Sequence, residues 1–146
     1  MELALLFLPL LGSIISGLFG KLIGDKNSEI VTSLFVSVSA VISFIIFYEV
    51  IFKDYENNIV ILSWIKSGSL NVNWSIKIDA LSSVMLVVVT LISSIVHIYS
   101  IGYMSHDPHK PRFMAYLSLF TFAMLTLVTS DNFLQLFFGW EGVGLC

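Results

Sequence analysis

Four long hydrophobic stretches decide what kind of protein this sequence can form. They run over residues 3–19, 30–52, 81–103 and 113–129. A helix needs about 20 apolar residues to cross the ~30 Å hydrocarbon core of a bilayer, and each stretch is long enough or nearly so. Each stretch therefore predicts a transmembrane helix. Gly20 and Lys21 are expected to close the first helix, and the polar run 53–58 the second.

A fifth apolar run follows a short turn in which Asp131 or Asn132 can cap a new helix. From Phe133 to Cys146 it has about 14 residues, or roughly 21 Å of helix at 1.5 Å per residue. That is too short to span a bilayer comfortably. The sequence therefore predicts the start of a fifth helix, with the chain stopping inside it.

The composition excludes a soluble domain. Hydrophobic residues make up 57% of the 146 residues and charged residues 12%, whereas charged residues are ~25% of an average globular protein. The net charge of −3 offers no basic face for nucleic acid. No Lys or Arg precedes the first apolar run, so we expect that run to be a retained helix and not a cleaved signal peptide.

The segment between the second and third stretches has a different pattern. Residues 70–78 alternate apolar and polar side chains, which is typical of a half-buried strand. Residues 59–65 form a second β-prone run, and the turn residues 66–69 separate the two. Trp64 and Trp74 suit the headgroup belt of a membrane. The predicted fold is thus an all-α membrane protein with four transmembrane helices, the start of a fifth, and a small extramembrane β-hairpin between helices two and three.

The positive charges predict an orientation. Lys21 and Lys26 lie in the first loop, and Lys110 and Arg112 in the third. By the positive-inside rule, these loops are expected on the cytoplasmic or matrix side. The amino terminus and the hairpin then face the opposite side.

Glu141 is the residue that most needs an explanation. In a helix that starts near Asn132 it lies roughly 13–14 Å from the start, close to the middle of the bilayer. A carboxylate there costs about 2.5–3.5 kcal/mol on insertion scales, so it should face protein or a wet cavity. A group in such a place can gain and lose a proton as nearby charge changes. The alternative is a structural Glu near the end of a shorter helix.

Three glycines, Gly139, Gly142 and Gly144, surround Glu141. Glycine lets a second helix approach closely or allows local unwinding, and either would help to hydrate the acid. Plain helix packing explains them equally well.

The third helix carries a polar stripe of Ser83, Thr90, Ser94 and His97, whose spacing places them on one face. One interpretation is a proton path, with His97 as a weaker candidate than Glu141. The other is small-residue packing with one satisfied histidine. Asp79, just before this helix, is expected to be its N-cap.

No catalytic, cofactor-binding or metal site is predicted in this chain. The sequence has no Gly-rich phosphate loop and no cysteine cluster, and Cys146 is its one cysteine. His106 and His109 are expected to be solvated loop residues, too few and too flexible to hold a metal.

Several segments resemble one family closely: residues 74–82, 98–104, 111–113 and 137–146. The last contains Gly139-Trp140-Glu141-Gly142-Val143-Gly144, which is the most specific piece. They resemble the amino-terminal part of subunit L, or mitochondrial chain 5, of the proton-pumping NADH:quinone oxidoreductase (respiratory complex I). The resemblance runs over essentially the whole chain.

The resemblance implies an antiporter-like proton channel in the membrane arm of that complex. The family's fifth-helix glutamate matches Glu141, and in the family it works with a lysine on a later helix that this chain does not contain. NADH, FMN, iron–sulfur clusters and quinone would be bound by other subunits. The implied partners are those membrane-arm subunits and the lipid of an energy-coupling membrane, bacterial or mitochondrial.

The resemblance also implies three segments. Residues 1–57 would hold the first two helices, residues 58–115 the hairpin, third helix and following loop, and residues 116–146 the fourth helix and the start of the channel domain. Enzymatic activity would then belong to the complex and not to a site in this chain. Two alternatives stay open: a subunit of a multi-subunit cation/proton antiporter, and a truncated remnant without function.

Overall fold

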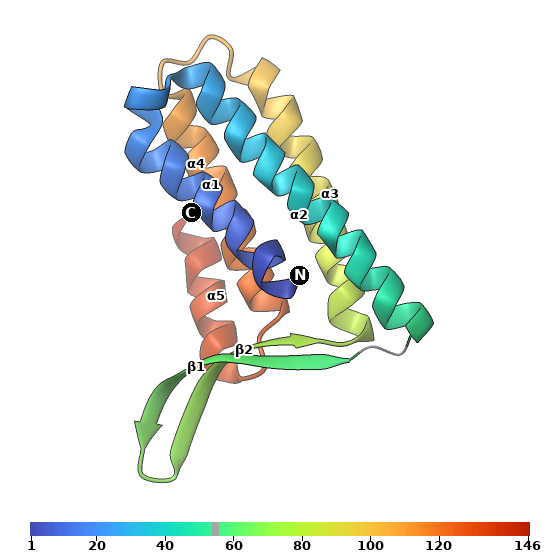
Figure 1. The fold of residues 1–146 in the computed structure, drawn as a ribbon. Helices are drawn as coiled ribbons and strands as arrows, with labels where there is room; N and C mark the ends of the chain where they lie inside the picture. The colour runs from blue at the N-terminus through green and yellow to red at the C-terminus, as the bar shows by residue number, and fades with distance from the viewer. Residues whose placement is uncertain (54–55) are drawn as a thin grey trace.

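The computed structural model describes residues 1–53 and 56–146. Four long helices form a bundle, a two-stranded hairpin closes one end of it, and a shorter fifth helix stands beside it (Figure 1). The elements are α1 (Glu2–Ile23), α2 (Asp25–Lys53), β1 (Asn57–Ser67), β2 (Leu70–Ile78), α3 (Ala80–Tyr103), α4 (Lys110–Val128) and α5 (Phe133–Leu145). The predicted fold, with its hairpin between the second and third helices, is confirmed.

Helices α1 to α4 are each long and apolar enough to cross a membrane. Their outer surface carries large apolar side chains such as Leu22 and Leu81, which are 84% and 76% exposed. Exposure of such a surface is unfavourable in water and favourable in lipid. The connection from α1 to α2 and the connection from α3 to α4 lie at one end of the bundle, and the amino terminus, the hairpin and the connection from α4 to α5 lie toward the other (Figure 1). The four basic residues expected in these loops lie instead in the adjoining turns of α1, α2 and α4, and they are Lys21, Lys26, Lys110 and Arg112. The predicted orientation in the membrane stays a prediction.

The helices extend beyond the hydrophobic stretches. The expectation that Gly20 and Lys21 close the first helix is wrong, because α1 continues to Ile23 and ends at Gly24, whose φ is 88°. Gly20 lies inside this helix and leaves room for Pro111 of α4, since a Cβ on Gly20 would lie 2.6 Å from the Pro111 Cβ. A helix can continue through polar flanks, since its backbone hydrogen bonds do not depend on the lipid boundary. The predicted end of the second stretch includes residues 54–55, which lie outside the described residues.

The hairpin is antiparallel and turns at Gly68, whose positive φ of 58° suits glycine. Strand β1 is longer than the predicted run 59–65, and the pairing register shifts at two points between Val60 and Ile65. Strand β2 matches the predicted range and buries Ile76 and Ile78. The apolar side of β2 therefore faces the bundle.

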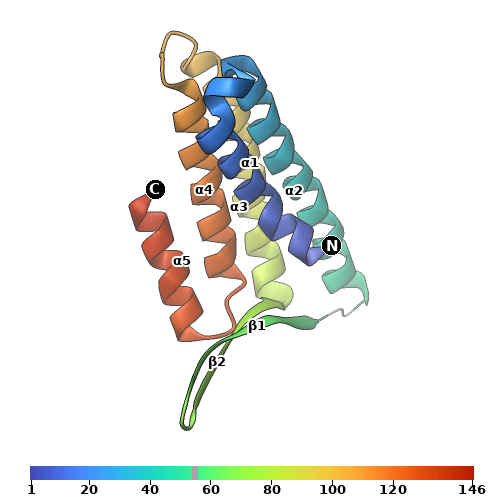
Figure 2. The same cartoon turned by 60° about the vertical axis from the view of Figure 1, so that its left-hand side comes forward.

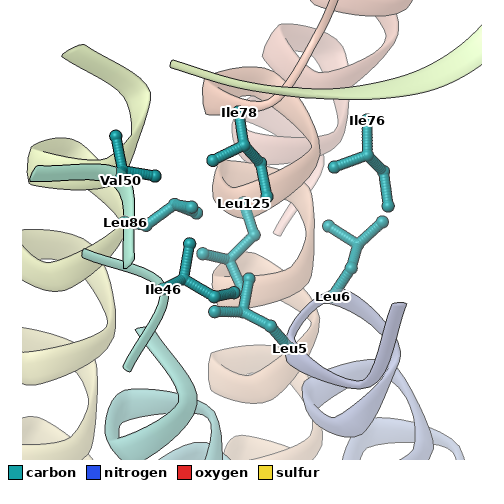
Figure 3. Close-up of a cluster of buried hydrophobic side chains, with 8 residues drawn as sticks. All are labelled: Leu5, Leu6, Ile46, Val50, Ile76, Ile78, Leu86 and Leu125. Carbon is teal, nitrogen blue, oxygen red and sulfur yellow. The ribbon is translucent and has the colours of Figure 1, made fainter. Parts of the chain in front are cut away.

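The core of the molecule lies at the hairpin end of the bundle. Leu5 and Leu6 of α1 meet Leu125 of α4 there, and Ile76 and Ile78 of β2 cover them (Figure 3). Ile46, Val50 and Leu86 complete this cluster. Burial of each such side chain contributes about 1.5–3 kcal/mol relative to exposure in water. The hairpin is thus fixed to the helices by apolar contact.

Candidate functional site

Helix α5 stands outside the four-helix bundle and packs along α4 (Figure 2). Two glycines form the contact. A Cβ on Gly139 would lie 2.8 Å from the backbone of Leu127, and a Cβ on Gly142 would lie 3.0 Å from the Cβ of Ala123. A Cβ on Gly144 would meet nothing within 4 Å. Gly139 and Gly142 therefore allow the close approach of α5 to α4, whereas Gly144 lies away from it.

Glu141 lies on the other side of α5. It follows Gly139 by two residues, which is roughly 200° around the helix. Its side chain is exposed, as are those of the neighbouring Phe137 and Trp140, at 60% and 66%. In the part of the chain that the structure describes, no cation pairs with Glu141. Its predicted protein or cavity surroundings would have to come from other polypeptide segments.

The start of α5 is fixed to the hairpin by polar side chains. Asn132 caps the helix, because its Oδ1 accepts from the N–H of Gln135 at 2.9 Å. The Asn132 Nδ2 also donates to the carbonyl oxygen of Asn73 in β2, at 2.8 Å. The backbone N–H of Lys77 donates to the carbonyl oxygen of Thr129 at 2.9 Å. These contacts set where α5 begins, and so how deep Glu141 lies along it.

Gln135 completes this attachment, and the sequence analysis did not single it out. Its Nε2 donates to the carbonyl oxygen of Ser75 at 2.7 Å, and its Oε1 accepts from the Ser75 N–H at 3.1 Å. Gln135 is fully buried. A signal was available, since it is the one polar side chain between Phe133 and Trp140 in an otherwise apolar run that also contains Gly139.

An aromatic cluster lies beside the same attachment. Trp64 of β1 and Trp74 of β2 have ring centroids 5.2 Å apart. Phe138 of α5 meets Trp74 at 4.9 Å and Trp64 at 6.1 Å, in both cases edge to face. The two tryptophans, interpreted from the sequence as headgroup residues, thus also contact α5.

His97 is fully buried between α3 and α4. Its Nδ1 lies 2.7 Å from the carbonyl oxygen of Ser93, and its Nε2 lies 3.2 Å from the Oγ of Ser118. The Ser93 hydroxyl is in turn hydrogen-bonded to that of Thr121. His97 is therefore held by both ring nitrogens, and no hydrogen bond found among the described residues joins it to Glu141.

The predicted polar stripe of α3 is buried along its length. The Thr90 hydroxyl lies 2.7 Å from that of Ser43, and the Ser94 hydroxyl lies 2.9 Å from that of Ser37, both on α2. Ser83 is also buried and donates to the carbonyl oxygen of Ala80. These contacts satisfy the polar groups and at the same time line up exchangeable hydroxyls. The proton-path hypothesis for His97 stays a prediction.

Asp79 caps α3 as predicted. Its Oδ1 accepts from the N–H of Ser82 at 2.8 Å, and the Ser82 Oγ accepts from the Asp79 N–H at 2.8 Å, which is a capping box. The hydrogen bond from the Ser82 N–H is the main reason that the pKa of Asp79 is lowered, with Lys77 adding to it. His106 and His109 are exposed. The described residues contain no group of His, Cys, Asp and Glu that could hold a metal ion.

Comparisons with known proteins give a consistent result. The family model described as "NADH-Ubiquinone oxidoreductase (complex I), chain 5 N-terminus" matches residues 64–114. Proteins named NADH-ubiquinone oxidoreductase chain 5 from Phytophthora infestans and Arabidopsis thaliana are each 56% identical to this chain over 99% of its length. The chain spans 22% of the length of each of these two relatives.

One similar protein has a different name. A Neurospora crassa protein named "Probable intron-encoded endonuclease 4" is 48% identical over the whole chain. The match covers 27% of that protein.

Proposed function

We propose that this chain belongs to the NADH-ubiquinone oxidoreductase chain 5 family, and that it contributes to proton translocation in the membrane arm of that complex. The observation that carries the proposal is the position of Glu141, the one charged residue of α5. The complex would lie in an energy-coupling membrane, which agrees with four helices able to span one.

The surroundings of Glu141 support a protein interface on that side of α5. Its exposed neighbours Phe137 and Trp140 are apolar. In lipid, a carboxylate among them would cost about 2.5–3.5 kcal/mol. Contact with further polypeptide, supplying a cation or a wet cavity, removes that cost. Gly139 and Gly142 hold the opposite side of α5 on α4, so Glu141 is directed away from the bundle toward such a partner.

The chemistry of this role is an exchange of protons coupled to charge. When a lysine from another segment approaches Glu141, the carboxylate form is favoured and the proton leaves. When the lysine withdraws, the carboxyl group takes up a proton again. The protein therefore needs no redox centre of its own. NADH, FMN, iron–sulfur clusters and quinone would be held by other subunits, and the chain would act in the enzyme only as a membrane subunit.

The sequence leaves two other functions open, namely a cation/proton antiporter subunit and a remnant without function. A tagged form of the chain, expressed in its host and purified in mild detergent, separates them. We expect the tag to co-purify with membrane-arm subunits and with NADH oxidation coupled to quinone reduction. Purification with antiporter subunits and without NADH oxidation would support the first alternative. Purification of the tagged chain alone would support the second.

A further inference from the structure

A cavity of about 630 Å³ lies between α1 and the start of α4, at the end of the bundle where α1 connects to α2 and α3 to α4 (Figure 1). Its lining includes the cations Lys21, in the last turn of α1, and Arg112, in the first turn of α4. Asp25 at the start of α2 adds a carboxylate, and His109 adds an imidazole ring. Two positive charges against one negative leave the walls with a net positive charge.

The two cations have no carboxylate partner. In the part of the chain that the structure describes, the ion pairs lie elsewhere, at Glu2 and Glu49. Asp25 therefore shares the cavity with Lys21 and Arg112 without forming an ion pair with either of them. A concave site with walls of one net sign concentrates ions of the opposite sign. The cavity is thus suited to an anion from outside the chain.

Arg112 is oriented in a way that suits a phosphate. Its Nε donates to the Tyr116 hydroxyl at 3.3 Å, and its guanidinium carbon lies 5.6 Å from the centre of the Tyr116 ring. Among the described residues, no acceptor binds the two Nη groups of this guanidinium. A guanidinium fork with free N–H groups matches two oxygens of a phosphate. Tyr116 restrains the side chain and leaves those donors available.

The distance between the two cations is set by a close contact of their helices. Gly20 and Pro111 directly precede Lys21 and Arg112 in the sequence, and a Cβ on Gly20 would lie 2.6 Å from the Pro111 Cβ. The Ser16 Oγ also donates to the carbonyl oxygen of Pro111 at 2.7 Å. The backbone positions that carry the two cations are therefore fixed relative to one another before any ligand binds.

The outer rim of the cavity is largely apolar. Leu18 and Tyr116 belong to the lining, and they are 76% and 46% exposed. The exposed side chains of Leu11 and Ile14 continue the face of Leu18 along α1, toward the middle of the bundle. Free phosphate gains nothing from such a surface, whereas a phospholipid can place an acyl chain on it. Basic pockets between transmembrane helices are typical sites for anionic lipid headgroups.

We propose that this cavity binds the phosphate of an anionic phospholipid. Lys21 and Arg112 contact the phosphate oxygens, and the exposed apolar side chains of α1 contact an acyl chain. The single negative charge of a phosphodiester matches the excess positive charge of the lining. Glu141 lies on α5 and takes no part in this site, so the lipid site and the proton-carrying role can each fail without the other.

Native mass spectrometry of the full chain in detergent micelles measures the binding of individual ligands. Phosphatidylglycerol, phosphatidylcholine and inorganic phosphate are titrated separately and in competition. We expect phosphatidylglycerol to bind at least about fivefold more tightly than phosphatidylcholine, and an equal concentration of inorganic phosphate to leave it bound. Equal affinities for the two lipids would overturn the proposal. Displacement of phosphatidylglycerol by inorganic phosphate would also overturn it, because the cavity would then be a site for a free anion.

Variants show whether the lipid binds in this cavity. Lys21→Gln and Arg112→Gln each remove one exposed cation and should weaken phosphatidylglycerol binding by about fivefold or more. Lys26→Gln is the matched control, since it removes the same charge from the same end of the bundle but from outside the lining. Its affinity should stay near that of the wild type. Asp25→Asn removes the carboxylate of the lining and should tighten binding, a gain that misfolding does not produce.

Two results from the variants would contradict the proposal. The first is wild-type affinity in both cation variants or in Asp25→Asn. The second is an equal loss in Lys26→Gln and Arg112→Gln, which would show that the lipid is attracted by general surface charge and not by this cavity.

Discussion

Gln135 binds the backbone of Ser75 through both ends of its amide, donating to the carbonyl oxygen at 2.7 Å and accepting from the N–H at 3.1 Å. The side chain thus takes the place of a neighbouring strand at this point of β2. Both residues are buried, at 0% and 1% exposure. Because α5 starts from this contact, the hairpin determines the position of the helix that carries Glu141.

Replacement of Gln135 by leucine is predicted to destabilise this attachment. Gln135→Leu keeps the size of the side chain but leaves the N–H and carbonyl groups of Ser75 buried without partners, at about 1–3 kcal/mol each. Thermal unfolding of the purified protein in detergent measures the loss. Ser75→Ala is the control, because it keeps the backbone groups that Gln135 binds. Equal unfolding temperatures for Gln135→Leu and Ser75→Ala would contradict the prediction.

Gly139 is predicted to be the glycine on which the contact between α4 and α5 depends. A Cβ there would lie 2.8 Å from the Leu127 backbone, and backbone cannot move aside cheaply. Gly139→Ala should therefore cost about 1–3 kcal/mol as overpacking. Cross-linking between cysteines placed on α4 and α5 reports the altered contact. Gly144→Ala, which meets open space, should behave as wild type, and an equal loss in both variants would show that the packing argument is wrong.

The apolar pattern predicted the helices and the hairpin because both depend on local periodicity. Membrane helices must bury apolar side chains in lipid, and β2 must turn Ile76 and Ile78 toward the core. The caps at Asp79 and Asn132 also follow from a few adjacent residues. These parts of the fold are readable from the sequence, since each is determined within one segment.

Contacts between distant segments could not be predicted in the same way. Gly20 was expected to end the first helix, but its role depends on Pro111, far along the chain. Gln135 and Ser75 are 60 residues apart, and only the folded chain joins them. The same holds for the candidate site. The sequence predicts the polar stripe that ends at His97, but it does not predict the residues of α2 and α4 that contact this stripe.

The N-cap of α3 predicts a pH dependence. The pKa of Asp79 is lowered, chiefly by the Ser82 N–H, so its stabilising effect is complete above the unfolded pKa of about 3.9 and is lost as the pH falls through the lower folded pKa. Asp79→Ala should cost about 0.5–2 kcal/mol near neutral pH. Unfolding temperatures measured from about pH 7 down to about pH 2 check this. The wild type and the variant should converge at the acidic end, and a constant difference would argue against the cap.

The proton-carrying role of Glu141 is decided by the number of protons pumped per electron in a complex I whose chain 5 subunit carries Glu141→Gln. Vesicles containing the assembled complex are supplied with NADH and quinone, and electron transfer and proton uptake are recorded together. Glu49→Gln, whose carboxylate pairs with Lys53 on the surface of α2, is the matched control. We predict fewer protons per electron in Glu141→Gln, with NADH oxidation by an artificial acceptor unchanged and the control at the wild-type ratio. A wild-type ratio in Glu141→Gln would contradict a proton-carrying role for this residue.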